Sequence, residues 1–137
     1  MTHRKILIVL SIFHAAVSTL YLARFFRVLP PEEIVSGYIP WFMSFALPNI
    51  AFALITWLLV YSLLKKCDAL AVLSGLINAG GMIFLSLNGL MFGFYSGFLK
   101  MMTFNAIFEI VVYLYGLSLA VYYITQFWAV IQKKEND

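Results

Sequence analysis

Four polar side chains stand inside long apolar stretches of this sequence and are the residues best placed to do chemistry: His14, Asn49, Asn88 and Glu109. In hydrocarbon an unpaired polar or ionisable group costs several kcal/mol, so each of them needs a partner, a ligand or water. Helical residues rise about 1.5 Å each, which places all four roughly 12 to 17 Å below the outer ends of their stretches. The sequence therefore predicts one polar cluster near the middle of a membrane.

Glu109 and His14 are the ionisable members of this predicted cluster. A carboxyl group at this depth must be protonated, paired with His14 or Arg24, or exposed to a water-filled cavity. Together the two groups could orient a polar head group, exchange protons, or act as acid and base on a lipid-soluble substrate. The opposing interpretation is that such side chains only tie helices together, contributing about 0.6 kcal/mol per hydrogen bond.

Helical spacing extends the predicted site beyond these four residues. On the first apolar stretch, Tyr21 lies on the same helical face as His14, with Arg24 at its outer edge. On the last stretch, Tyr113 follows Glu109 by one turn. The predicted ligand-binding residues are His14, Tyr21, Arg24, Asn49, Asn88, Glu109 and Tyr113.

Other kinds of chemistry lack their residues. The sequence has no GxxxxGK[ST], GxGxxG, HExxH or GxSxG motif, which argues against nucleotide binding, zinc proteolysis and α/β-hydrolase catalysis. Cys67 is the single cysteine, so neither an internal disulfide nor a CxxC pair can form. His14 and Glu109 are too few ligands for a metal ion. We predict no metal and no cofactor.

The amino-acid composition indicates that these residues are held in a membrane domain. Of the 137 residues, 64% are hydrophobic and 11% are charged, whereas soluble domains carry about 25% charged residues. The formal charge of +3 is distributed over the ends of the apolar stretches, which argues against nucleic-acid binding. We predict a single membrane domain over residues 1–137 whose surroundings are membrane lipids.

Four apolar stretches predict an all-α integral membrane four-helix bundle, with spans at about 5–24, 39–64, 69–95 and 101–131. Each is as long as or longer than the roughly 20 residues that cross a bilayer. The basic start and apolar run of the first stretch resemble a signal peptide, but the polar His14 interrupts the run and favours a retained helix.

Basic residues predict the orientation of the bundle. The nine lysines and arginines fall on two sides, with Arg4, Lys5, Lys65, Lys66, Lys133 and Lys134 on one and Arg24, Arg27 and Lys100 on the other. The richer side is expected to face the cytoplasm. We therefore predict a multi-pass protein of the cell or inner membrane with both termini cytoplasmic.

The longest connection is the external loop at about 25–38. Two prolines followed by two glutamates, at 30–33, are typical of a helix start, so we expect a short interfacial helix in this loop. Tyr38 and Trp41 are interpreted as part of an aromatic belt at the membrane surface.

Proline and glycine predict local geometry within the spans. Pro48 cannot donate a hydrogen bond to the carbonyl of Ser44, which predicts a kink in the second span. Gly89, Gly93 and Gly97 form a ladder that favours close approach of helices. The ladder could act inside the bundle, in a homodimer, or against a partner in a membrane complex.

Three functions fit these observations. The first is a protein that binds or transports a small amphiphilic or lipid-like molecule in a polar pocket inside the bundle. The second is an accessory subunit of a larger membrane complex. The third is an intramembrane acid–base enzyme, for example an isomerase, acting on a lipid-soluble substrate. The first is favoured, which makes enzymatic activity the less expected outcome.

Overall fold

The computed structural model describes residues 4–26, 28, 31–101 and 103–135, with side chains up to residue 132, and within these ranges the chain forms helices and no strand. The helices are α1 (Arg4–Phe25), α2 (Tyr38–Ser44), α3 (Ala46–Leu64), α4 (Asp68–Ser96) and α5 (Phe104–Glu135), with a 3-10 turn, η1 (Phe98–Lys100). Helices α1, α3, α4 and α5 are long and apolar enough to cross a membrane. The predicted all-α class is confirmed for the described residues, and so is the presence of four long apolar helices.

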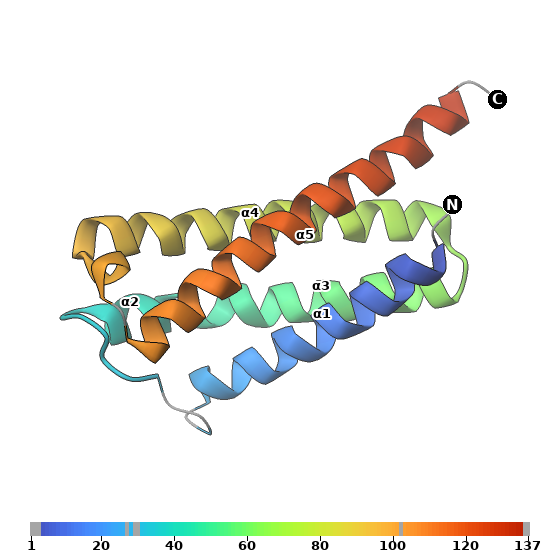
Figure 1. Ribbon diagram of the computed structural model, residues 1–137. Helices are drawn as coiled ribbons and strands as arrows, with labels where there is room; N and C mark the ends of the chain where they lie inside the picture. The colour runs from blue at the N-terminus through green and yellow to red at the C-terminus, as the bar shows by residue number, and fades with distance from the viewer. Residues whose placement is uncertain (1–3, 27, 29–30, 102, 136–137) are drawn as a thin grey trace.

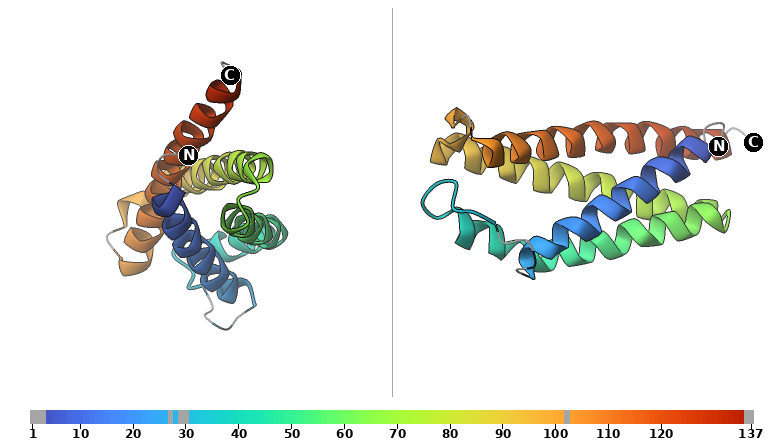
Figure 2. Two further views of the ribbon diagram at one scale, coloured as in Figure 1. Left: turned by 90° about the vertical axis from the view of Figure 1, so that its right-hand side faces the viewer. Right: turned by 60° about the horizontal axis from the view of Figure 1, so that its bottom comes forward.

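The four long helices form an open series (Figure 1). Extensive contacts join α1 to α3, α3 to α4, and α4 to α5. Helices α1 and α5 run obliquely across the other two and are separated at the end that carries the 25–38 loop (Figure 2). Both termini lie at the opposite end of the bundle, as an even number of spans requires.

The end of the bundle near the termini is held by an apolar core and by two polar contacts between helices. Buried side chains from all four long helices form the core, among them Leu7, Leu59, Leu63, Tyr123 and Phe127. Ser11 on α1 shares a hydrogen bond of 3.0 Å with Tyr123 on α5. Thr56 on α3 donates one of 2.6 Å to Asn78 on α4. This end is therefore closed by direct packing.

The second predicted span, 39–64, is interrupted rather than continuous. Helix α2 ends at Ser44 and α3 begins at Ala46. Because Pro48 has no N–H group, the Ser44 carbonyl lacks its normal helical donor, and the chain turns at Phe45. The helix resumes with a hydrogen bond of 2.9 Å from the Asn49 amide to the Phe45 carbonyl. The proline effect predicted as a kink is thus a break that separates a short helix from the span.

The short helix expected within 25–38 begins instead at the end of that range, as α2. The described residues between Phe25 and Tyr38 contain no helix. Glu33 accepts hydrogen bonds from the backbone amides of Gly37, at 2.7 Å, and Ile39, at 3.2 Å. Its carboxylate thereby satisfies two free amides at the start of α2. Glu33 thus lies at the start of a helix, but that helix begins five residues after it, so the prediction of a helix inside the loop is wrong for the described residues. The proline at 30 lies outside the described residues.

The glycine ladder is occupied by side chains of the same protein. The Tyr113 ring fills the space over Gly89, and a Cβ at Gly93 would lie 2.6 Å from the Phe98 ring. Gly97 has a φ of 79° and ends α4. Gly89 and Gly93 therefore let α4 approach α5 and η1. Contact with a second chain through this ladder stays a prediction.

Candidate functional site

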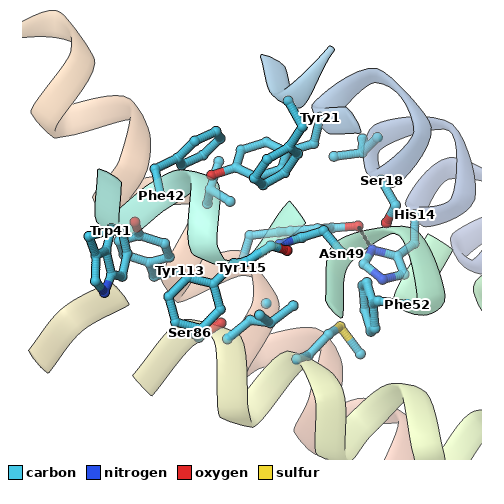
Figure 3. A pocket seen from close by; sticks show the side chains of 17 residues that line it. His14, Ser18, Tyr21, Trp41, Phe42, Asn49, Phe52, Ser86, Tyr113 and Tyr115 are labelled. Atoms are coloured by element: carbon cyan, nitrogen blue, oxygen red, sulfur yellow. Dashed lines mark hydrogen bonds between the residues drawn. The ribbon is translucent and has the colours of Figure 1, made fainter. Parts of the chain in front are cut away.

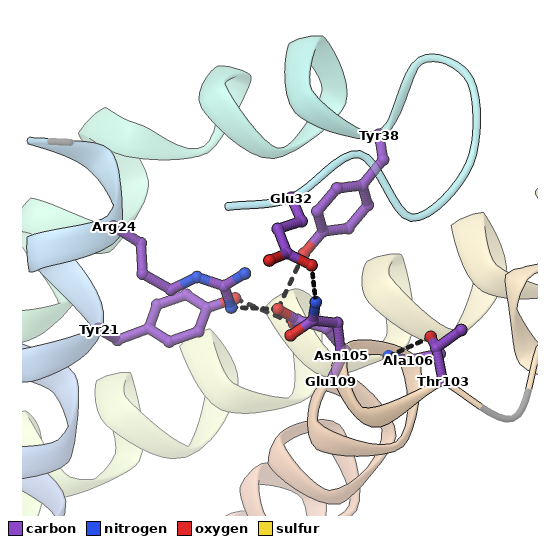
Figure 4. Close-up of polar contacts among 8 residues, drawn as sticks. All are labelled: Tyr21, Arg24, Glu32, Tyr38, Thr103, Asn105, Ala106 and Glu109. Carbon is purple, nitrogen blue, oxygen red and sulfur yellow. Dashed lines mark hydrogen bonds and ion pairs between the residues drawn. The ribbon is translucent and has the colours of Figure 1, made fainter. Parts of the chain in front are cut away.

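A buried carboxylate lies at the centre of the half of the bundle that carries the 25–38 loop, which we call the outer half because it is the half away from both termini. Glu109 on α5 is 0% exposed. Its Oε1 accepts hydrogen bonds from Arg24 Nη1 and, at 2.8 Å, from the Tyr38 hydroxyl, while its Oε2 accepts one from the Tyr21 hydroxyl at 3.1 Å (Figure 4). We call Tyr21, Arg24, Tyr38 and Glu109 the carboxylate cluster. The charge on Glu109 is therefore balanced by one cation and hydrogen-bonded on both oxygens.

Three separate helices supply the carboxylate cluster. Tyr21 and Arg24 lie one turn apart on α1, Tyr38 is the first residue of α2, and Glu109 lies on α5. Each hydrogen bond to Glu109 joins segments at least 71 residues apart in sequence. The cluster therefore joins α5 to α1 and α2, which also pack on each other through the stacked rings of Phe25 and Phe42.

Aromatic rings surround the guanidinium group of Arg24. Its carbon lies 5.0 Å from the ring centre of Phe42, 5.4 Å from that of Tyr21 and 6.0 Å from that of Phe108. Ring faces attract cations most strongly where water is excluded. These contacts and the ion pair with Glu109 both favour a charged Arg24 within an apolar surrounding.

Tyr38 lies at the start of α2, outside the four long helices α1, α3, α4 and α5, and is fully buried. Burial, followed by the nearby Glu109 carboxylate, raises the pKa of the Tyr38 hydroxyl well above its ordinary value. The hydroxyl is therefore neutral at physiological pH and acts as a hydrogen-bond donor. Its interpretation as an interfacial belt residue missed this role.

An open groove of about 560 Å³ runs along the carboxylate cluster between α1 and α5. At its outer edge Asn105 donates a hydrogen bond from its amide to Glu32 (Figure 4). The rest of the groove is mainly apolar. The described residues that line it are Val17, Leu20, Tyr21, Arg24, Glu32, Phe104, Asn105, Phe108 and Val112. The groove is polar at its outer edge and apolar along its length.

A second, inner cavity of about 100 Å³ lies deeper among the four long helices and α2 (Figure 3). Its described lining combines aromatic and aliphatic side chains with a few uncharged polar ones: His14, Val17, Ser18, Tyr21, Phe25, Trp41, Phe42, Phe45, Asn49, Phe52, Met82, Leu85, Ser86, Val112, Tyr113, Tyr115 and Gly116. Val17, Tyr21 and Val112 line both this cavity and the groove. The two spaces therefore adjoin.

Two buried polar atoms in the lining of the inner cavity have no hydrogen-bond partner: His14 Nε2 and the Tyr113 hydroxyl. His14 is 4% exposed and Tyr113 is 6% exposed. The other ring nitrogen of His14, Nδ1, lies 3.5 Å from the Tyr115 hydroxyl, the upper limit of a hydrogen bond. A buried polar atom without a partner is unfavourable by about 1 to 3 kcal/mol, so these two atoms mark places where a ligand or water gains a contact.

The residues predicted to form one cluster fall into two groups and an outlier. Glu109 lies in the carboxylate cluster, paired with Arg24 and not with His14. His14 and Asn49 line the inner cavity, where Asn49 also donates to the carbonyl of its own helix turn at Phe45. Asn88 donates to the carbonyl of Phe84 on its own helix and lines neither space.

The remaining predicted site residues are placed with one group or the other. Tyr21 belongs to the carboxylate cluster and lines both spaces, and Tyr113 lines the inner cavity one helical turn after Glu109 on α5. Glu32 and Tyr115 were not among the predicted site residues. Glu32 reaches the groove through the fold of the 25–38 loop, and Tyr115 reaches the inner cavity through the crossing of α1 and α5. Neither arrangement can be predicted from spacing in the sequence.

No group of three or more His, Cys, Asp or Glu side chains that could hold a metal ion occurs among the described residues. The sequence matches no protein-family model, no curated protein and no solved structure. The chemistry of the two spaces therefore has to be argued from their own residues.

Proposed function

We propose that this membrane protein binds a small single-chain amphiphile that enters sideways from the lipid through the groove between α1 and α5. The observation that carries this proposal is a groove that is polar at its outer edge, apolar along its length, and adjacent to a cavity inside the bundle. An amphiphile has the same order of polar and apolar parts. The volume of about 560 Å³ lies within the range of roughly 300 to 1,000 Å³ that is common for ligand pockets.

The charges along the groove favour a head group with no net charge. Arg24 and Glu32 are the charged residues in its described lining, and they carry opposite signs. Arg24 uses Nη1 for Glu109 and has further N–H donors, since a guanidinium group carries five. A zwitterionic head, with its phosphate toward Arg24 and its ammonium toward Glu32, meets both charges. A purely anionic head would meet the like charge of Glu32, and a purely cationic head would leave the remaining N–H donors of Arg24 without an acceptor.

The orientation of this site in the membrane follows from the basic residues. With Lys65, Lys66 and both termini on the cytoplasmic side, the groove opens toward the outer leaflet. The ligand would then be taken from that leaflet. Transport would require a second conformation that opens the inner cavity toward the cytoplasmic side.

The two alternative functions have less support. Acid–base catalysis by Glu109 and His14 would need both groups at one substrate, but Glu109 is held by Arg24 while His14 faces a different space. For an accessory subunit, the glycine ladder was the predicted partner surface, and Gly89 and Gly93 are already covered by side chains of the same chain.

Native mass spectrometry of the protein in maltoside micelles tests the proposal. Three probes that share one chain length are added in turn: dodecylphosphocholine, dodecyltrimethylammonium and dodecyl sulfate. We expect a saturable one-to-one adduct with the phosphocholine that outlasts adducts of the other two on collisional activation. Equal retention of all three would show unspecific micelle carry-over and would overturn the proposal.

A matched pair of asparagine variants places the adduct in the groove. Asn105→Ala removes the amide that holds Glu32 at the groove edge, whereas Asn88→Ala changes an asparagine outside both spaces. One hydrogen bond contributes about 0.5 to 1.5 kcal/mol, so Asn105→Ala should weaken phosphocholine binding by a factor of roughly 2 to 13. Asn88→Ala should bind as the unchanged protein does. Equal weakening by both variants would contradict this placement.

A further inference from the structure

We infer that the inner cavity is a distinct subsite for a short, uncharged aliphatic chain that ends in a hydroxyl group, which His14 recognises through Nε2. The inference deepens the proposed function and rests on it, because the cavity adjoins the groove at Val17, Tyr21 and Val112. It specifies the end of the ligand away from the head group, which the residues of the groove do not determine.

The first argument is the unpartnered nitrogen. His14 is buried, lines the cavity and has no hydrogen-bond partner for Nε2. Figure 3 shows His14 at one end of the cavity beside Asn49 and Phe52, while Tyr113 lies toward the other end. The ring is held among aromatic side chains, with centroids 5.4 Å from Phe52 and 5.9 Å from Tyr115. A ring held in this way, with one nitrogen free, is preorganised to form a hydrogen bond with a ligand.

The second argument concerns the kind of group that can bond to this nitrogen. If the Tyr115 hydroxyl donates to Nδ1, Nε2 carries the hydrogen and donates; in the other tautomer Nε2 accepts. A hydroxyl group can both accept and donate, so it satisfies either form of His14. The Tyr113 hydroxyl offers a further partner at the other end of the cavity.

The third argument is charge. The described lining of the inner cavity contains no aspartate, glutamate, lysine or arginine. An ion would therefore lose its water without gaining a counter-charge. Phe42, Phe45, Phe52, Met82 and Leu85 instead present apolar surface. The occupant is uncharged, and most of it is hydrocarbon.

The fourth argument is size. A volume of about 100 Å³ is smaller than the roughly 150 Å³ of an engineered apolar cavity that binds benzene. A short unbranched chain therefore fits better than a ring with substituents. 1-Butanol and n-pentane have the same number of heavy atoms and differ in one hydroxyl, which makes them a matched pair of probes.

Nitrogen NMR of the His14 side chain tests the inference directly. The full chain carries His3→Gln, which leaves His14 as its only histidine, and is labelled with ¹⁵N in the imidazole ring and placed in lipid nanodiscs. We expect 1-butanol to shift the Nε2 resonance saturably, and n-pentane at equal bilayer concentration to leave it within a tenth of that shift. No shift with butanol, a shift that never saturates, or equal shifts with both probes would overturn the inference.

Two serine variants locate the response. Ser18→Leu adds bulk to the cavity lining, whereas Ser118→Leu makes the same change at an exposed position of α5 outside it. The first should reduce the butanol shift at least fivefold and the second should retain it. Equal shifts in both variants would contradict binding in this cavity. Because this readout needs no phosphocholine, its failure is distinguishable from failure of the groove, which the native mass spectra report.

Discussion

Helix α1 forms an arginine–carboxylate pair at each end, and the two pairs differ in their surroundings. At the outer end, the Arg24 and Glu109 side chains are 14% and 0% exposed. At the end near the termini, Arg4 and Asp68 lie 3.0 Å apart with side chains 22% and 41% exposed. Arg4 also donates to the Leu63 carbonyl at 2.6 and 3.1 Å. The same chemistry is thus used once in the protein interior and once at its surface.

The difference shows what burial does to an ion pair. Water screens the exposed pair and competes for its hydrogen bonds, so such a pair contributes about 0 to 1 kcal/mol. Inside, removal of one partner leaves a charge without water, which costs about 3 to 5 kcal/mol. The Arg24–Glu109 pair therefore contributes strongly to holding α1, α2 and α5 together around the groove. The Arg4–Asp68 pair contributes little to stability.

The largest expected effect is that of Arg24→Leu, which leaves the Glu109 charge without its cation. We expect a loss of about 3 to 5 kcal/mol in the free energy of unfolding, measured in mixed maltoside and dodecyl sulfate micelles. Arg24→Leu combined with Glu109→Leu should recover most of this loss, since neither charge is then buried. A double variant as unstable as the single one would show that Arg24 acts through packing.

A smaller effect is expected from Tyr38→Phe, which removes one hydrogen bond to Glu109 and keeps the ring. Hydrogen bonds to charged groups contribute about 1.5 to 3 kcal/mol, so unfolding should become easier by that amount. Tyr61→Phe is the matched control, because Tyr61 is 55% exposed and faces outward. Equal effects of the two substitutions would show that the hydrogen bond from Tyr38 to Glu109 does not contribute to stability.

The smallest effect is expected from Asp68→Asn at the exposed pair. The free energy of unfolding should fall by no more than about 1 kcal/mol, and the difference from the unchanged protein should shrink as salt is added. The same micellar titration measures it. A loss as large as that of Arg24→Leu, and insensitive to salt, would mean that exposure does not separate the two pairs.

The sequence correctly predicted the features that depend only on position along the chain. Hydropathy located the four long helices, and the depth of Glu109 correctly required a partner, which is Arg24. The rotation of each helix was harder to predict. Asn88 was predicted at a depth similar to that of Glu109, but its amide donates to the Phe84 carbonyl, a local hydrogen bond that any helical asparagine can form.

Contacts made by the loop could not be predicted at all. Tyr38 reaches Glu109 because the 25–38 loop folds back and because the helix breaks at Phe45 ahead of Pro48. The sequence indicated a disturbance at Pro48 but not its extent. A short helix freed from its span can turn its first residue into the bundle, and that rotation depends on tertiary contacts.

The most direct test of the central claim, that an amphiphile enters between α1 and α5, is photolabelling with a single-chain phosphocholine that carries a diazirine in its chain. The probe is used at less than one equivalent per protein in nanodiscs, with and without excess dodecylphosphocholine, and labelled peptides are sequenced. We predict labels competed by dodecylphosphocholine near Val17 and Leu20 on α1 and near Phe104 and Phe108 on α5. Labels spread evenly over outward-facing residues such as Leu54 on α3, and insensitive to the competitor, would contradict the account.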